Sequence, residues 1–111
     1  MIKNILLIFA LFCTSLYANA STTGTTKINR IVSYTNHGNG DVIFTVKSPI
    51  SACTGYWLSK DDSGFNANLS MIIAAFQSQS NLIISGDSDE EQKWTGSTSS
   101  YCKLESVDYR L

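Results

Sequence analysis

The sequence predicts a mainly β domain with one helix, arranged as a small five-stranded barrel of the OB type. Two observations predict this class: short segments rich in β-branched and aromatic residues recur between turn residues, and one segment switches to a helical period. The expected order is strand, strand, strand, helix, strand, strand, which is the element order of the OB-fold. An open α+β sheet with one covering helix has the same order and remains the alternative.

Residues 1–20 have the features of a signal peptide. Lys3 supplies the positive charge, residues 5–12 form a short apolar run, and Ala18-Asn19-Ala20 matches a small-residue cleavage pattern. The run is shorter than the roughly 20 residues that a membrane-spanning helix needs. A phenylalanine precedes Cys13, where a lipidated cysteine would need a small residue. We expect cleavage after Ala20, export to the periplasm or beyond, and no membrane insertion afterwards.

The chain that remains divides into a flexible leader and one domain. Residues 21–27 are small, polar and rich in threonine, which is typical of a flexible segment, and residues 28–111 form the expected domain. The whole sequence has eight basic and nine acidic residues, a net charge of −1. No basic stripe is present, so nucleic acid is not an expected partner.

The first three strands are expected before the helix. Residues 28–35 and 41–48 alternate in character, and the Asn-Gly pair at 39–40 predicts a hairpin turn between them. Pro49 ends the second strand because proline cannot donate to a sheet. Residues 53–60 form a shorter third strand.

The expected helix follows within residues 65–80. Its apolar residues recur at helical spacing, and we expect this stripe to face the sheet: Leu69, Ile72, Ile73 and Phe76. Ala74 and Ala75 are placed at the margins of the stripe, and Asn66 or Asn68 is the expected cap.

Two further strands are expected after the helix. Residues 81–87 form the fourth, and residues 102–111 form the last, with a change of alternation that indicates a bulge. Between them, four carboxylates at 87–91 form an acidic loop, and they lack the ligand spacing of a calcium loop. We therefore interpret this segment as solvated and expect no metal or other cofactor.

Cys53 and Cys102 are predicted to form a disulfide. Paired thiols are oxidised in exported proteins, and a bridge over about 50 residues would stabilise a small domain by roughly 4 kcal/mol. Free or intermolecular thiols are the alternative. A catalytic cysteine needs a base, and the single histidine, His37, lies in a turn rich in glycine and asparagine. A structural zinc site needs four ligands at recognisable spacing.

We expect no catalytic residues, because neither a nucleophile motif nor a pair of carboxylates in an apolar setting is present. Trp94 and Tyr101 are the candidate ligand-contacting residues, at the two ends of a polar loop. For Trp94 the favoured interpretation is that it folds back onto the barrel mouth as a plug, and Tyr101 can instead pack around the disulfide. Trp57 is assigned to the core.

The segments DVIFTV, C…YWL, NLSMIIAAFQSQSNLIIS and WTGSTSSYCKLESVDY carry a resemblance. In this arrangement the chain resembles a group of short exported proteins of Gram-negative bacteria, which implies a single OB-type barrel. It is more distantly similar to the B subunits of pentameric bacterial toxins, which implies binding of cell-surface glycans and an oligomer.

The function expected from these features is that of an exported, non-enzymatic binding domain for a glycan or a protein. The alternatives are a structural protein of the cell envelope without a small ligand and an inhibitor of an exported enzyme.

Overall fold

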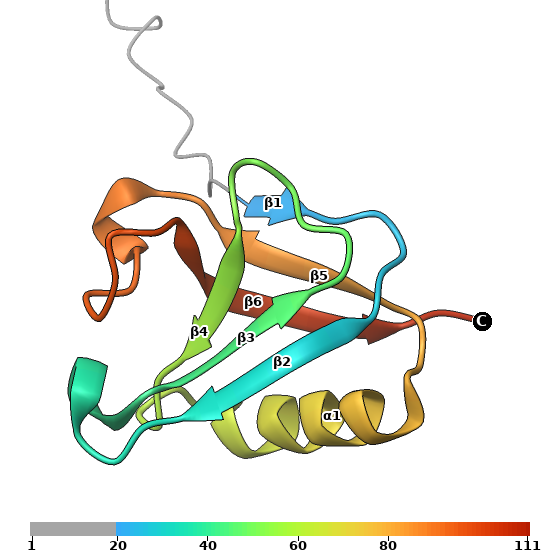
Figure 1. The fold of residues 1–111 in the computed structure, drawn as a ribbon, viewed down its shortest axis with the longest axis horizontal. Helices are drawn as coiled ribbons and strands as arrows, with labels where there is room; N and C mark the ends of the chain where they lie inside the picture. Colours follow the sequence, from blue (N-terminus) through green and yellow to red (C-terminus); the bar gives the residue numbers. More distant parts are fainter. Residues whose placement is uncertain (1–19) are drawn as a thin grey trace, which may run out of the picture.

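The computed structural model describes residues 20–111. Residues 1–19, which hold Cys13 and nearly all of the expected signal peptide, lie outside the described residues. The described chain forms one six-stranded mixed sheet with the helix α1 (Phe65–Ser78) beside it (Figure 1). The prediction of a mainly β fold with one helix is confirmed.

The strands follow the predicted order, with one short strand added at the start. They are β1 (Ala20–Thr22), β2 (Ile28–Ser33), β3 (Val42–Val46), β4 (Gly55–Leu58), β5 (Leu82–Asp87) and β6 (Tyr101–Tyr109). Their order in the sheet is β1-β5-β6-β4-β3-β2. The β4–β6 pair is parallel, and the other pairs are antiparallel.

The sheet is not closed into a barrel, so the open α+β alternative describes the fold. The two edge strands of the sheet are β1 and β2. A closed barrel would need β2 to pair with β5, but β1 pairs with that side of β5 instead. The segment 21–27, expected to be a flexible leader, contributes to this pairing. Thr22 lies opposite Ser85, and Thr26 exchanges two backbone hydrogen bonds of 2.9 Å with Leu82. Backbone pairing needs no apolar pattern, which explains why the threonine-rich sequence gave no sign of it.

The turn between β2 and β3 is built from left-handed backbone. The short helical turn η2 (His37–Gly40) contains Gly38, Asn39 and Gly40 at φ values of 59°, 65° and 72°. Glycine adopts this region without strain, and asparagine tolerates it better than other residues do. The predicted Asn-Gly turn is therefore confirmed.

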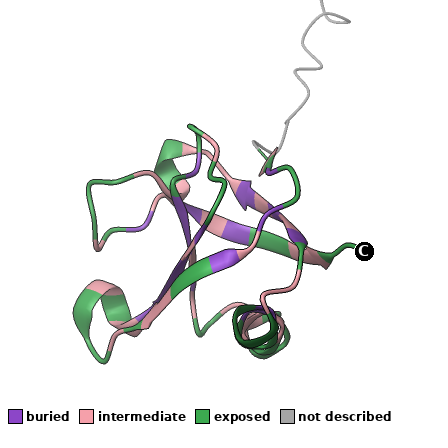
Figure 2. Cartoon of the chain, turned by 45° about the vertical axis from the view of Figure 1, so that its right-hand side comes forward, coloured by how far each residue is buried: buried purple, intermediate pink, exposed green. Residues whose placement is uncertain are grey.

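The main core lies on one face of the sheet, between the sheet and the helix. β3 and β4 alternate, so that Phe44 and Tyr56 point into this core, while Ile43, also buried, points to the opposite face. Buried positions therefore occur on both faces of the sheet. Figure 2 shows buried segments on several of its strands. The residues of the main core are Ile28, Val42, Phe44, Val46, Cys53, Tyr56, Leu58, Ile72, Ala75, Leu82, Ile84, Cys102 and Leu104.

The helix is rotated relative to the predicted stripe. Ile72 and Ala75 are fully buried, whereas Ile73 is 46% and Phe76 36% exposed. The helix lies beside β2 and β6, and the small side chain of Ala75 permits close approach there, which turns Ile73 outward. The expected asparagine cap is also wrong, because Gly64 precedes the helix and no side chain caps it.

Tyr56→Phe is expected to raise the free energy of unfolding by about 1 kcal/mol. The ring of Tyr56 is fully buried against Phe44, with 5.1 Å between ring centroids, and its hydroxyl has no hydrogen-bond partner among the described residues. Burial also raises the pKa of Tyr56 to about 12. The variant lacks this desolvated hydroxyl, which forms no compensating hydrogen bond in the folded state. Chemical denaturation would measure the resulting gain in stability.

Tyr109→Phe is the matched control, because the Tyr109 hydroxyl donates to the backbone oxygen of Met71. This variant should give no gain in stability. A loss of stability in Tyr56→Phe would show that a bound water or an alternative packing satisfies the hydroxyl.

Candidate functional site

A cleft of about 500 Å³ is lined by residues of the β2–β3 turn, the end of β4 and the 93–100 loop. Figure 1 shows these three segments on the same side of the molecule. Eight of the cleft's nine lining residues carry side-chain hydrogen-bonding groups of amide, carboxylate, hydroxyl or ammonium type, and the ninth is a tryptophan. The lining residues are Thr35, Asn36, Asn39, Asp41, Trp57, Ser59, Lys60, Asp61 and Thr95.

The turn after β4 presents its polar side chains to the cleft through a set of local hydrogen bonds. The backbone N–H of Asp62 donates to Ser59 O at 3.0 Å, and the Ser59 N–H donates to Asp62 Oδ2 at 3.2 Å. The N–H of Asp61 donates to Ser59 Oγ at 3.2 Å. Short polar side chains favour such turns because they bond to nearby backbone. Lys60 and Asp61 therefore lie at the tip, exposed at the rim of the cleft.

Trp57 supplies the aromatic surface of the cleft. Its neighbours Tyr56 and Leu58 point into the main core, so the alternation of β4 turns Trp57 to the opposite face, where it is half-buried. Its indole Nε1–H donates to Gln92 O at 2.9 Å. The ammonium of Lys103 lies 5.4 Å from the centre of the ring and forms a 3.0 Å ion pair with Asp62. These contacts fix the ring in one orientation, and the assignment of Trp57 to the core is therefore only half right.

Asp41 forms the inner wall of the cleft and connects it to Trp94. The residue is 5% exposed, and its Oδ2 accepts a hydrogen bond of 3.1 Å from Trp94 Nε1. Burial raises the pKa of Asp41, while the bond from Trp94 and the charge of Lys60 act in the opposite direction. The carboxylate is thus a preorganised acceptor that links two loops.

Asp41→Asn is expected to change how stability depends on pH. The folded state binds the proton of Asp41 more tightly than the unfolded state, where the pKa is about 3.8. The stabilisation from this group is complete below that value and is lost as the pH rises through the raised folded pKa. The difference in unfolding free energy, wild type minus variant, should therefore fall in urea titrations as the pH rises above about 3.8. A difference that grows with pH would show that the bond from Trp94 outweighs burial.

Trp94 itself is buried within a cluster of aromatic rings. It is 4% exposed, and its ring centroid lies 5.8 Å from that of Tyr34, 5.5 Å from that of His37 and 5.8 Å from that of Tyr101. His37 Nε2 donates to Gly96 O at 2.8 Å, which joins the two loops around the ring. Trp94 therefore folds back as a plug and does not present its faces to a ligand.

Tyr101, the second candidate, is half-buried and stacks on Trp94 rather than lining the cleft. Its ring covers Gly55, where an added Cβ would lie 2.9 Å from Cζ. The cleft is lined from this loop by Thr95 rather than by Trp94 or Tyr101. For Trp57, the alternation of side chains along β4 was the sequence feature that could have predicted its outward orientation.

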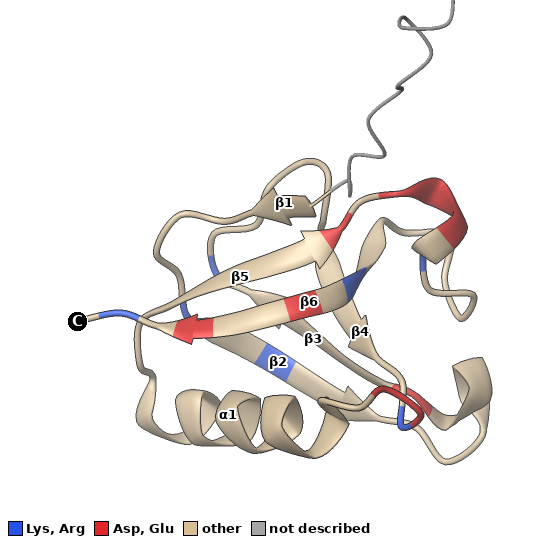
Figure 3. Ribbon diagram, turned by 180° about the vertical axis from the view of Figure 1, so that it is seen from behind, with Lys and Arg blue, Asp and Glu red and all other residues tan. Residues whose placement is uncertain are grey.

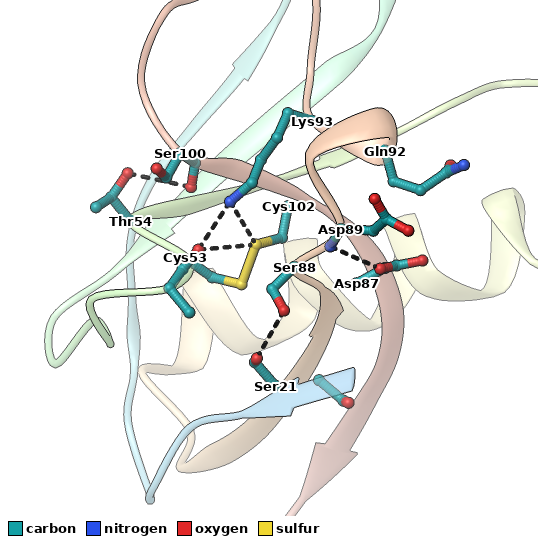
Figure 4. Close-up of a disulfide and its surroundings, with 12 residues drawn as sticks. Ser21, Cys53, Thr54, Asp87, Ser88, Asp89, Gln92, Lys93, Ser100 and Cys102 are labelled. Carbon is teal, nitrogen blue, oxygen red and sulfur yellow. Dashed lines mark hydrogen bonds between the residues drawn. A yellow bond between two sulfur atoms is a disulfide. The ribbon is translucent and has the colours of Figure 1, made fainter. Parts of the chain in front are cut away.

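Cys53 and Cys102 form the predicted disulfide, with both residues fully buried (Figure 4). Lys93 lies beside it and donates from Nζ to Ala52 O at 2.9 Å and to Cys102 Sγ at 3.7 Å. Thr54 is held next to the bridge by its N–H bond of 2.9 Å to Ser100 O. The disulfide and these hydrogen bonds therefore connect both ends of the 93–100 loop to residues 52–54, which lead into β4.

The acidic loop uses its side chains locally. The N–H of Asp89 donates to Asp87 Oδ1 at 2.9 Å, and the N–H of Glu91 donates to Asp89 Oδ1 at 3.1 Å, at the start of η3 (Glu90–Gln92). Within residues 20–111, no three or more potential metal-ligating side chains come together. The same residues include no helix with the length and apolar character to cross a membrane.

Comparison with known proteins finds similarity to solved structures. No protein-family model and no curated protein matches the sequence. A solved structure of human heat-labile enterotoxin in complex with a blood group A antigen analog is similar, with a TM-score of 0.49 and 12% sequence identity. The match covers 86% of this chain and 89% of that chain. This similarity assigns neither ligand nor assembly to this chain.

Proposed function

We propose that this protein binds a saccharide in the cleft between the β2–β3 turn, the end of β4 and the 93–100 loop. The observation that carries the proposal is the composition of the lining: eight residues with polar or charged side chains surround one indole ring. Sugars present many hydroxyl groups and an apolar ring face, so amide and carboxylate groups beside a fixed aromatic ring suit them. A drug-like apolar ligand would need a predominantly apolar lining.

Binding without catalysis is part of the proposal. Asp41, whose pKa burial raises, already accepts a hydrogen bond from Trp94 Nε1, which occupies its carboxyl group at the base of the cleft. The disulfide between Cys53 and Cys102 supports export, because such bonds persist in oxidising compartments. An exported protein can encounter saccharides of a cell surface or of the cell envelope.

A glycan array followed by titration in solution tests the proposal. The array identifies the best-bound glycan, and Asn39→Gly is then compared with wild type. Glycine accepts the φ of 65° found at Asn39, so the turn should persist while one amide is lost from the cleft. We expect an affinity loss of about threefold to tenfold, the effect of one hydrogen bond.

Gln77→Ala is the matched control, since it removes an exposed amide from α1 and should leave the affinity unchanged. Absence of binding to every arrayed glycan by folded, oxidised protein would refute the proposal. Equal affinity in wild type and Asn39→Gly would place the site elsewhere.

The second candidate function is contact with a protein through α1. Ile73 and Phe76 are exposed on this helix, and no residue from Phe65 to Ser78 is charged. Such a surface is more typical of a protein contact than of a solvated face. This candidate covers the structural and inhibitor roles considered above, and crosslinking in envelope extract with and without Phe76→Ser would distinguish it from saccharide binding.

A further inference from the structure

We propose that the cleft selects neutral and amino-substituted saccharides over anionic ones, and that Asp61 determines this selectivity. The inference rests on the proposed function and extends it to a class of ligand. It follows from the charges that line the cleft and from the pairing of those just outside it.

The lining carries more negative than positive charge. Asp41 and Asp61 contribute carboxylates, and Lys60 is the only basic residue among the lining residues. Asp41 Oδ2 accepts a hydrogen bond from Trp94 Nε1, so a polar donor satisfies this buried group at the base of the cleft. A ligand in the cleft is therefore close to one uncompensated negative charge.

Lys103, which contacts the lining residue Trp57, does not offset this charge. Lys103 lies over the ring of Trp57 and forms its ion pair with Asp62 at 3.0 Å. The Lys103–Asp62 pair has no net charge, so it leaves the net negative charge of the cleft lining unchanged. The turn after β4 is accordingly marked mainly by acidic residues, with one short basic segment (Figure 3).

Asp61 is the residue that can act on a ligand directly. Asp41 is buried, and its carboxylate is held by Trp94 at the base of the cleft. Asp61 is exposed, and it is the backbone N–H, rather than the carboxylate, that bonds within the turn. Its carboxylate can therefore accept hydrogen bonds from sugar hydroxyls or pair with a sugar ammonium, and it repels a sugar carboxylate or sulfate.

The expected discrimination is about threefold to tenfold for one added negative charge on the ligand, because the interaction takes place close to water. It should shrink in about 1 M salt, where the screening length is only about 3 Å.

The test uses pairs of glycans that differ by a single charged group. The neutral array glycan bound best is titrated against oxidised, full-domain protein, and so is the same glycan bearing one sialic acid or one sulfate. Asp61→Asn should make the two affinities equal, and Lys60→Gln should widen the gap between them. Glu105→Gln changes the net charge by the same amount as Asp61→Asn from an exposed position on β6 outside the cleft lining, and it should leave the ratio unaltered.

The outcomes separate this inference from the function on which it rests. If the neutral glycan binds and the anionic one binds as tightly, or if Asp61→Asn leaves the ratio unchanged, the selectivity is refuted and saccharide binding stands. If wild type binds no glycan at all, both are refuted. A ratio that Glu105→Gln removes equally would assign the effect to overall charge and would also overturn the role of Asp61.

Discussion

Replacing Cys53 and Cys102 together by alanine is expected to lower the free energy of unfolding by about 4 kcal/mol. The bridge joins residues 49 positions apart, so its removal releases a long loop in the unfolded chain. A domain of this size has a small free energy of unfolding, so the loss should leave the variant partly unfolded at about 37 °C. Equilibrium denaturation in urea, with the double variant beside wild type, measures the effect.

The control for this prediction uses the variant itself. Both sulfurs are fully buried, so wild type must be unfolded in denaturant before a dithiol reductant can act. After refolding under reductant, wild type should have the stability of the double alanine variant, and the variant should not respond to reductant at all. Wild type that keeps its oxidised midpoint after verified reduction would show that packing alone holds the fold.

The features that could be predicted from the sequence are those encoded by neighbouring residues. The Asn-Gly pair at 39–40 required left-handed backbone and formed the turn. The change of alternation in 102–111 corresponds to a real bulge, because Ser85 pairs with Ser106 and Gly86 with Leu104, which leaves Glu105 as the extra residue. With two cysteines left after the expected cleavage, one intrachain pairing was available.

The features that sequence reasoning missed depend on tertiary contacts. β1 exists because the edge of β5 is available to a polar segment, and the threonines of that segment carry no pattern that shows it. The rotation of α1 depends on how closely Ala75 approaches the sheet, which periodicity alone does not fix. The helical spacing of the apolar residues was read correctly, but it did not decide which of them would be buried.

The cleft was missed for the same reason, because it joins three segments that are distant in the chain. Asn39, Trp57 and Thr95 come from a hairpin turn, a strand and a loop, and only the fold brings them together. Of the two tryptophans, Trp57 was assigned to the core and is half-buried instead, whereas Trp94 adopts the plug that was weighed against ligand contact. The buried acceptor on Asp41 that satisfies the indole N–H of Trp94 could not be read from the sequence, and Trp57 faces outward by strand alternation.

Trp94→Ala is expected to lower the free energy of unfolding by about 3 kcal/mol, at the lower end of the range for buried aromatic truncations. Three aromatic rings lose their shared contact, and the buried Asp41 loses the donor that satisfies it. Trp94→Phe should retain part of the stacking but still lose the hydrogen bond, for a smaller cost of about 1–3 kcal/mol. Denaturation of the three proteins measures the series, and near-ultraviolet circular dichroism should lose the signal of the ordered cluster.

The backbone around Trp94 provides an independent test of the same packing. A Cβ added at Gly96 would lie 2.3 Å from Cζ2 of Trp94, whereas one added at Gly24 would meet no atom within 4 Å. Gly96→Ala should therefore displace the ring and lower stability by about 1–3 kcal/mol, and Gly24→Ala, the matched control, should have little effect. In the Trp94→Ala background the ring is absent, so Gly96→Ala should lose most of its cost; this non-additivity is the signature of direct contact. Additive losses would mean that the Trp94 ring and the Gly96 backbone stabilise the fold independently. Direct packing of Trp94 against the 93–100 loop would then be refuted.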